Sequence, residues 1–212
     1  GMAIEALRII RYGALALIAI LVLGWIAVGL GLIDLGGRKP AANDRFELGT
    51  QVVQAFKLTD HTGKAVSESD VLGRPAVVFF GFTYCPEVCP TTMISLSSTL
   101  GKMGAAADKL GVYFVTVDPE RDTVEELKNY MAQFDPRIRG LTGAADQIAA
   151  VAKPLRVYYA KAKVEGGAGY TMDHDATVYL IDAKGGFAGS IAYGEDAAVA
   201  LAKLERLAKG AP

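Results

Sequence analysis

The residues most able to do chemistry are the only two cysteines of the chain, Cys85 and Cys89, in the stretch GFTYCPEVCPTTM. Two closely spaced thiols can form a disulfide, exchange with the disulfide of a partner, or bind a soft metal ion such as Cu(I) or Zn(II). Pro86 and Pro90 stiffen this loop, so little ordering is lost when both sulfurs engage one ligand. The pair alone therefore indicates either redox or metal chemistry.

A metal site needs a third ligand, and the chain has only two histidines. His174 lies in the segment YTMDHD, just before an apolar stretch at 176–182, and is the candidate third ligand. Structural zinc normally takes four protein ligands, whereas a trigonal set of two sulfurs and one imidazole suits copper. His61 lies in a polar turn beside Gly63, and we expect it to face solvent rather than a metal.

The elements around the cysteines are expected to place them where a strand ends and a helix begins. Residues 76–82 form a continuous apolar run, as in a strand covered on both faces, and residues 91–107 carry apolar groups at helical spacing. A helix N-terminus favours negative charge and lowers the pKa of a cysteine. Because Cys89 precedes a proline, we expect it to cap this helix, with Cys85 in the loop just before.

The rest of the domain alternates predicted strands and helices. Residues 112–117 are rich in β-branched and aromatic residues and indicate a second buried strand, and the next helix opens with a capping box at Thr123 and Glu126. A weak strand is predicted at 52–58, a helix at 145–152 and an edge strand at 155–161. Two strands at 176–182 and 187–193 are predicted to form a hairpin, and a final helix is predicted at 197–209. This order predicts an α/β fold with a thioredoxin-like mixed sheet flanked by helices.

Asp118 follows the second buried strand, in the segment DPERD. From the end of a neighbouring strand its carboxylate could hydrogen-bond a metal ligand and so orient it. The alternative is a loop that satisfies its own backbone. A calcium loop is excluded, because the positions that need glycine and glutamate hold Thr123 and Asn129.

A long apolar segment near the N-terminus predicts one transmembrane helix that precedes the domain. Residues 12–33 carry no charge and would form a helix roughly 33 Å long, enough for a hydrocarbon core of about 30 Å. The run is longer than the apolar region of a cleaved signal peptide, and no good small-residue cleavage site follows it. The predicted organisation is a tail at 1–11, a transmembrane anchor at 12–33, a linker at 34–43 and a domain at 44–212.

Four segments, FGFTYCPEVCP, VTVDPERDT, GLTG and YTMDHDATVYLID, occur in the same order in the Sco/SenC family, which the chain resembles from about residue 46 to 207. The resemblance implies a thioredoxin-like, membrane-tethered, copper-binding protein that assists assembly of the dinuclear copper (CuA) centre of cytochrome c oxidase. It implies Cys85, Cys89 and His174 as the copper ligands and Asp118 near the site. One departure is Met172, where the family more often has a smaller branched residue.

The resemblance also implies partners and a location. The expected partners are the apo CuA-bearing subunit of cytochrome c oxidase, the membrane, and a thiol reductant or another copper chaperone. The expected location is the inner (cytoplasmic) membrane, crossed once, with the domain facing the periplasm or the outside of the cell. The net charge of −1, without a dense cluster of Lys and Arg, argues against nucleic acid as a partner.

Copper delivery is the preferred function, so we expect a binding protein rather than an enzyme. A thiol–disulfide oxidoreductase that reduces partner cysteines, CuA ligands included, is the alternative, because it needs only Cys85 and Cys89. His174 discriminates between the two functions, since thiol exchange does not require it. A peroxidase is disfavoured, because Phe82 and Pro86 stand where peroxiredoxin-like motifs have threonine or serine.

Overall fold

The structure is a computed structural model that describes residues 12, 13, 15, 18, 20–24, 46–164 and 169–210. The chain divides into two compact units, Gly1–Arg45 and Phe46–Pro212, and the second holds the sheets and both cysteines. The described residues of the first unit are helical, and no helix within the described ranges is both long and apolar enough to cross a membrane. Most of the predicted anchor at 12–33, and all of the predicted tail and linker, lie outside these ranges.

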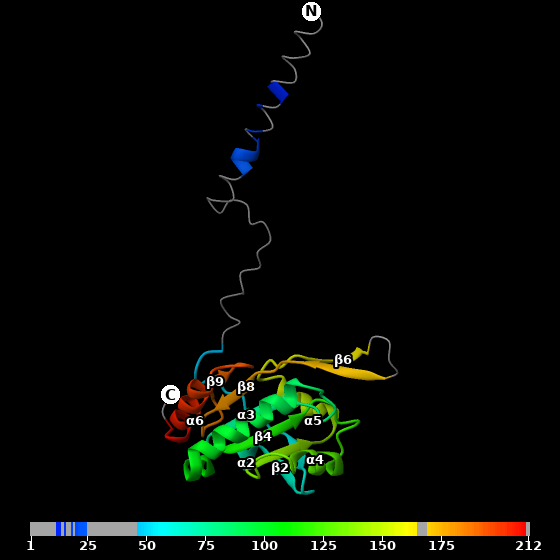
Figure 1. The fold of residues 1–212 in the computed structure, drawn as a ribbon, viewed down its shortest axis with the longest axis vertical. Helices are drawn as coiled ribbons and strands as arrows, with labels where there is room; N and C mark the ends of the chain where they lie inside the picture. The colour runs from blue at the N-terminus through cyan, green and yellow to red at the C-terminus, as the bar shows by residue number, and fades with distance from the viewer. Residues whose placement is uncertain are drawn as a thin grey trace, which may run out of the picture. The chain divides into compact units, whose positions relative to one another are not determined.

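A seven-stranded mixed sheet forms the centre of the domain (Figure 1). Its strand order is β2-β1-β5-β4-β3-β8-β9. The bounds are Lys57–Asp60 for β1, Ala65–Ser67 for β2, Ala76–Gly81 for β3, Gly111–Thr116 for β4, Ile138–Thr142 for β5, Val178–Ile181 for β8 and Phe187–Ile191 for β9. Strand β3 pairs parallel with β4 and antiparallel with β8, and all residues of β3 and β4 are buried, as their apolar runs predict.

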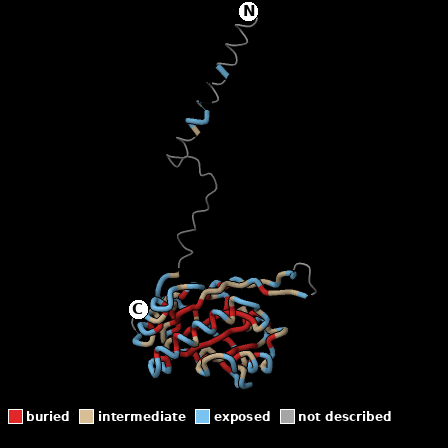
Figure 2. Tube along the Cα trace, viewed as in Figure 1, coloured by how far each residue is buried: buried red, intermediate tan, exposed pale blue. Residues whose placement is uncertain are grey.

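Helices pack around the sheet, with α3 against α6, α4 against β5 and α5 against β1. Their bounds are Glu68–Val71 for α2, Val88–Met103 for α3, Val124–Met131 for α4, Ala145–Ala152 for α5 and Ala197–Ala208 for α6, and a 3₁₀ helix follows α3 at Gly104–Lys109. Figure 2 shows the buried residues gathered in the middle of the domain. The predicted cap of α4 is confirmed, because the Thr123 hydroxyl accepts the Glu126 N–H.

Strands β6 (Tyr159–Lys163) and β7 (Tyr170–His174) form a separate two-stranded antiparallel sheet. Figure 1 shows this β6–β7 hairpin as an arm that extends from the rest of the domain. The edge strand predicted at 155–161 is therefore displaced, and it pairs with β7 instead of the main sheet. The sequence does not predict β7, because most of its residues are only half-buried and several are polar. As a result, His174 ends a strand instead of lying in a loop.

Two further differences from the prediction concern strands β1 and β5 of the main sheet. Of the strand predicted at 52–58, only the last two residues fall within β1, although Val52 and Phe56 are buried. The sequence does not predict β5, because Arg139 and Gly140 interrupt its apolar pattern. A Cβ added at Gly140 would lie 2.8 Å from the side chain of Met131, so α4 needs glycine to approach this strand.

Candidate metal centre

The cysteines lie at the junction of β3 and α3, but the helix begins earlier than the proline predicts. Glu87 is the N-cap and Val88 the first helical residue, so Cys89 lies in the first turn instead of capping it. Pro90 fits there because the N–H groups of a first turn have no partner within the helix. Cys85 lies in the preceding loop as expected, and the Cys89 N–H donates to the Cys85 Sγ at 3.3 Å.

The structure brings Cys85, Cys89 and His174 together, with one candidate ligand atom of each within 4.8 Å of the others. The Cys89 Sγ lies 3.3 Å from the His174 Nε2. On the other side of the ring, the His174 Nδ1 lies 2.8 Å from the Asp175 carbonyl oxygen, which can only accept a hydrogen bond. This contact keeps the proton on Nδ1 and leaves the lone pair of Nε2 facing the sulfurs. Cys89 is buried, whereas Cys85 and His174 are half-buried.

The two free thiols differ in charge state. The hydrogen bond from the Cys89 thiol is the largest cause that lowers the pKa of Cys85 to about 4, and the His174 imidazole and the Cys89 N–H contribute to the same shift. The same bond, with burial, raises the pKa of Cys89. Burial acts to lower the pKa of His174, but the Cys85 sulfur and the Asp175 carbonyl outweigh it and raise that pKa. At neutral pH Cys85 is therefore a thiolate and Cys89 keeps its proton.

Strand β3 supplies the walls that fix the imidazole and the buried sulfur. The His174 ring meets the rings of Phe79 and Phe82 edge-on, with centroids 6.2 Å and 5.7 Å away. A Cβ added at Gly81 would lie 2.8 Å from both the Cys89 Sγ and the Phe114 ring. Glycine at the end of β3 therefore leaves the space that the Cys89 sulfur occupies.

Asp122 anchors the cysteine loop, a role that the sequence does not reveal. Its side chain is fully buried, and its carboxylate accepts the Thr83 N–H at 3.0 Å, the Thr83 hydroxyl at 2.7 Å and the Thr116 hydroxyl at 2.6 Å. Burial raises the pKa of Asp122, although these hydrogen bonds oppose the rise. Thr83 lies two residues before Cys85, so Asp122 ties the loop to the end of β4. The only sequence signal is a second aspartate in the segment DPERD.

Asp118, predicted to orient a metal ligand, makes its contacts elsewhere. Its carboxylate pairs with Arg121 and accepts the Tyr170 hydroxyl at 2.8 Å, and neither partner is a candidate ligand. Its own N–H donates to the Thr116 hydroxyl at 2.9 Å. Asp118 thus connects the end of β4 to the first residue of β7.

His61 and Met172, whose side chains could bind a metal by type, lie outside the cysteine–histidine group. The Nδ1 of His61 accepts the Gly140 N–H at 3.1 Å, and His61 is half-buried. The expectation that His61 faces solvent is therefore wrong, and its role is to tie the β1 turn to β5. Met172 is 7% exposed and packs in the core, as its thioether side chain allows.

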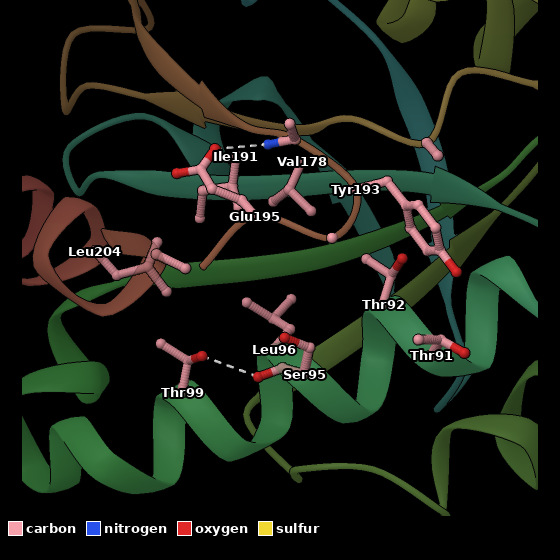
Figure 3. A pocket seen from close by; sticks show the side chains of 14 residues that line it. Thr91, Thr92, Ser95, Leu96, Thr99, Val178, Ile191, Tyr193, Glu195 and Leu204 are labelled. Carbon is pink, nitrogen blue, oxygen red and sulfur yellow. Dashed lines mark hydrogen bonds between the residues drawn. The ribbon is translucent and has the colours of Figure 1, made fainter. Parts of the chain in front are cut away.

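A cavity of about 200 Å³ lies between α3 and the strands β8 and β9, and none of the three candidate ligands lines it (Figure 3). The hydroxyls of Thr92 and Thr99 donate to carbonyls of their own helix, at 2.8 Å and 2.9 Å. The Glu195 carboxylate, also in view, accepts the Ala192 N–H and pairs with Lys203. These three polar side chains of the cavity are therefore engaged by the protein itself.

Fold and site together define a thioredoxin-like α/β domain whose two cysteines and one histidine suit a soft metal or thiol exchange. A family model described as SCO1/SenC matches residues 45–209, and the chain belongs to this family. Among curated proteins, it is 34% identical to the mitochondrial SCO2 homolog of Bos taurus over 177 residues, which are 79% of this chain and 66% of that protein. It is 38% identical to the mitochondrial SCO1 homolog of Homo sapiens over 135 residues, or 62% and 44% of the two chains. The chain thus spans between two fifths and two thirds of the length of these two relatives.

Solved structures with the same fold include two described as having copper bound. The copper-bound ScoI of Bradyrhizobium japonicum is 42% identical, has a TM-score of 0.68 and covers 74% of this chain and 99% of its own. The copper-bound yeast Sco1 is 31% identical, has a TM-score of 0.68 and covers 76% of this chain and 91% of its own.

Proposed function

We propose that this protein binds copper through the sulfurs of Cys85 and Cys89 and the Nε2 of His174. The observation that carries the proposal is that these three atoms lie within 4.8 Å of one another. Two sulfurs and one imidazole form a soft set that favours copper, and they fall one ligand short of a structural zinc site. The copper-bound relatives of known structure support the same choice of metal.

We further propose that the protein is a metallochaperone that delivers its copper to the CuA centre of cytochrome c oxidase. A site of three ligands, two of them half-buried, leaves room for a ligand of the acceptor to enter. Membership of the SCO1/SenC family supports this role. The proposed partner is the apo CuA-bearing subunit, with a thiol reductant or another copper chaperone upstream.

An anaerobic titration of the reduced protein with Cu(I), and a second with Cu(II), tests the copper site. We expect one ion per chain and, for His174→Ala, affinity reduced by roughly 70-fold to 160-fold, because one ligand is worth about 2.5 to 3 kcal/mol. The control is His61→Ala, which removes the other histidine without touching the site. Equal affinities for wild type and His174→Ala would contradict the ligand assignment.

A second candidate function, thiol–disulfide exchange, is favoured by the lowered pKa of Cys85. The Cys85 thiolate would attack a disulfide of the partner and release one partner thiolate. Cys89 would then attack the Cys85 sulfur, leaving a reduced partner and a Cys85–Cys89 disulfide that an external thiol must reduce. The His174→Ala protein separates the two functions, because exchange does not need the imidazole and should survive in it.

We also propose that residues 12–33 anchor the protein in the inner membrane, after a tail at 1–11 and before a linker at 34–43. The domain at 44–212 would then face the periplasm. The uncharged run of 22 residues supports the anchor, and the family match at 45–209 supports the domain boundary. We expect the full chain in the membrane fraction and a chain without residues 1–33 in the soluble fraction. A shortened chain that stays with the membrane would contradict the anchor.

A further inference from the structure

The position of His174 depends on side-chain contacts, because the hairpin that carries it does not pair with the main sheet. The β6–β7 hairpin that carries it pairs only within itself among the described strands, so no ladder of backbone hydrogen bonds joins it to the main sheet. In Figure 2 most of the arm is half-buried or exposed, in contrast to the buried centre of the domain. Side chains must therefore hold β7 at the place where His174 meets the cysteines.

The segment after β4 provides these contacts, and we call the five residues involved the hairpin clamp: Asp118, Glu120, Arg121, Lys161 and Tyr170. The Arg121 Nη1 donates to the Tyr170 carbonyl at 2.9 Å, and the guanidinium lies 3.9 Å from the Tyr170 ring centroid. The Tyr170 hydroxyl donates to Asp118. On the hairpin side, the Lys161 ammonium lies 2.6 Å from Glu120 and 4.5 Å from the Tyr170 ring centroid. The Tyr170 ring is thus contacted by two cations and a carboxylate.

Arg121 also reaches the cysteine loop, which the rest of the clamp does not. Its guanidinium lies 4.9 Å from the ring centroid of Tyr84, the residue before Cys85. It lies 5.8 Å from the ring of Phe82, which in turn meets the His174 ring. One planar cation therefore contacts the cysteine loop, the segment after β4 and the start of β7. Lysine has no planar guanidinium that could stack on the rings while its nitrogens donate to other groups.

One nitrogen of the Arg121 guanidinium, Nη2, is buried and has no hydrogen-bond partner among residues 46–164 and 169–210. A buried donor without a partner costs free energy, so the other contacts of the guanidinium must outweigh this cost.

We propose that Arg121 is a positioning residue for the copper site, one that holds the β6–β7 hairpin against the cysteine loop so that the Nε2 of His174 reaches the two sulfurs. The residue does not bind the metal. The inference rests on the proposed function for the identity of the metal, but the clamp itself is a property of the metal-free protein.

Cu(I) affinity, measured anaerobically by competition with a coloured chelator, tests this role in two backgrounds. In the otherwise wild-type protein, Arg121→Ala is expected to lower the affinity by about tenfold, as the loss of a residue that orients a ligand does. In the His174→Ala protein, the same substitution is expected to change the affinity by less than about twofold, because no imidazole remains to be positioned. Equal losses in both backgrounds would overturn the proposal and make Arg121 a general structural residue.

Arg137→Ala is the matched control, because Arg137 also pairs with an aspartate, Asp135, and donates to a carbonyl of another element, Gly104. It contacts none of the candidate ligands, so Cu(I) affinity should be unchanged. Should Arg121→Ala unfold, Arg121→Lys replaces it, with the same expectations in both backgrounds.

Amide hydrogen exchange of the metal-free protein tests the clamp without copper. We expect Arg121→Ala to speed exchange in β6 and β7 and to leave β3 and β4 unchanged, and unchanged exchange in the hairpin would overturn the proposal. A wild-type protein that binds no copper would instead contradict the proposed function, and the exchange result would still decide whether Arg121 holds the hairpin.

Discussion

Replacing Cys89 by serine is expected to weaken Cu(I) binding by about a thousandfold, the largest effect of any single substitution at the site. The buried sulfur supplies one of the two soft donors, and a serine hydroxyl is a hard ligand that keeps its proton. Four-ligand metal sites bind with about 10 to 16 kcal/mol, or about 2.5 to 4 kcal/mol per ligand. The upper value, which we expect for a buried sulfur, corresponds to about a thousandfold. Competition with a Cu(I) chelator under anaerobic conditions measures the affinity.

Proton release on copper binding is a second measurement that tests the effect of Cys89→Ser. Because the pKa of Cys85 is lowered and that of Cys89 is raised, Cys89 is the one of the two thiols that must lose a proton when the metal binds. At about pH 8, the wild type should therefore release about one proton more per Cu(I) ion than Cys89→Ser. A weakly buffered titration with a pH indicator measures this release.

Thr92→Ser is the control for Cys89→Ser, since Thr92 is a buried residue one turn further along α3 and offers no ligand to the group. Its Cu(I) affinity should match that of the wild type. An affinity within about tenfold of wild type for Cys89→Ser, less than a third of the expected loss in free energy, would show that the buried sulfur is not a ligand.

Replacing Asp122 by alanine is expected to lower the free energy of unfolding by about 3 kcal/mol. The substitution leaves the Thr83 N–H and two hydroxyls without their acceptor in a fully buried place, at about 1 to 3 kcal/mol for each donor left unpaired, and the hydroxyls can turn to recover part of this. For a domain of this size the midpoint of thermal unfolding should fall by roughly 6–12 °C. Calorimetry of the metal-free protein measures the shift.

Asp108→Ala provides the comparison, because Asp108 is exposed and pairs with Arg137 at 3.5 Å on the surface. Its effect on stability should stay within about 0.5 kcal/mol. If Asp122→Ala were as mild as Asp108→Ala, the hydrogen bonds to Thr83 and Thr116 would not be the attachment that holds the cysteine loop.

The sequence predicts the parts of the site that depend on local patterns. The apolar run of β3 and the helical spacing of α3 place Cys85 and Cys89 at a strand–helix junction, and the structure has them there. The start of α3 is wrong by two residues, because a proline is tolerated anywhere in the first turn of a helix and not only at its first position. The class of the sheet also follows, since strands and helices alternate before the final hairpin.

The contacts that join distant segments leave no such pattern. Strand β7 has one buried residue, Met172, among half-buried and exposed ones, so its composition does not indicate pairing with β6. Asp122 and Arg121 lie in a polar turn, where charged residues are ordinary, and their partners Thr83 and Tyr170 are 39 and 49 residues away. Only the folded structure shows that Asp122 contacts the cysteine loop and that Arg121 contacts the start of β7.

The unequal burial of the three candidate ligands sets an order for ligand exchange. Because none of the surface of Cys89 is exposed, whereas Cys85 and His174 are half-buried, an incoming ligand would meet Cys85 or His174 first. Substitution would then proceed stepwise, with the outer donors displaced first while the inner sulfur still holds the ion. The bond to Cys89 would break last, so a metal could leave only once an acceptor had already bound it, and free copper would not be released into the surrounding water.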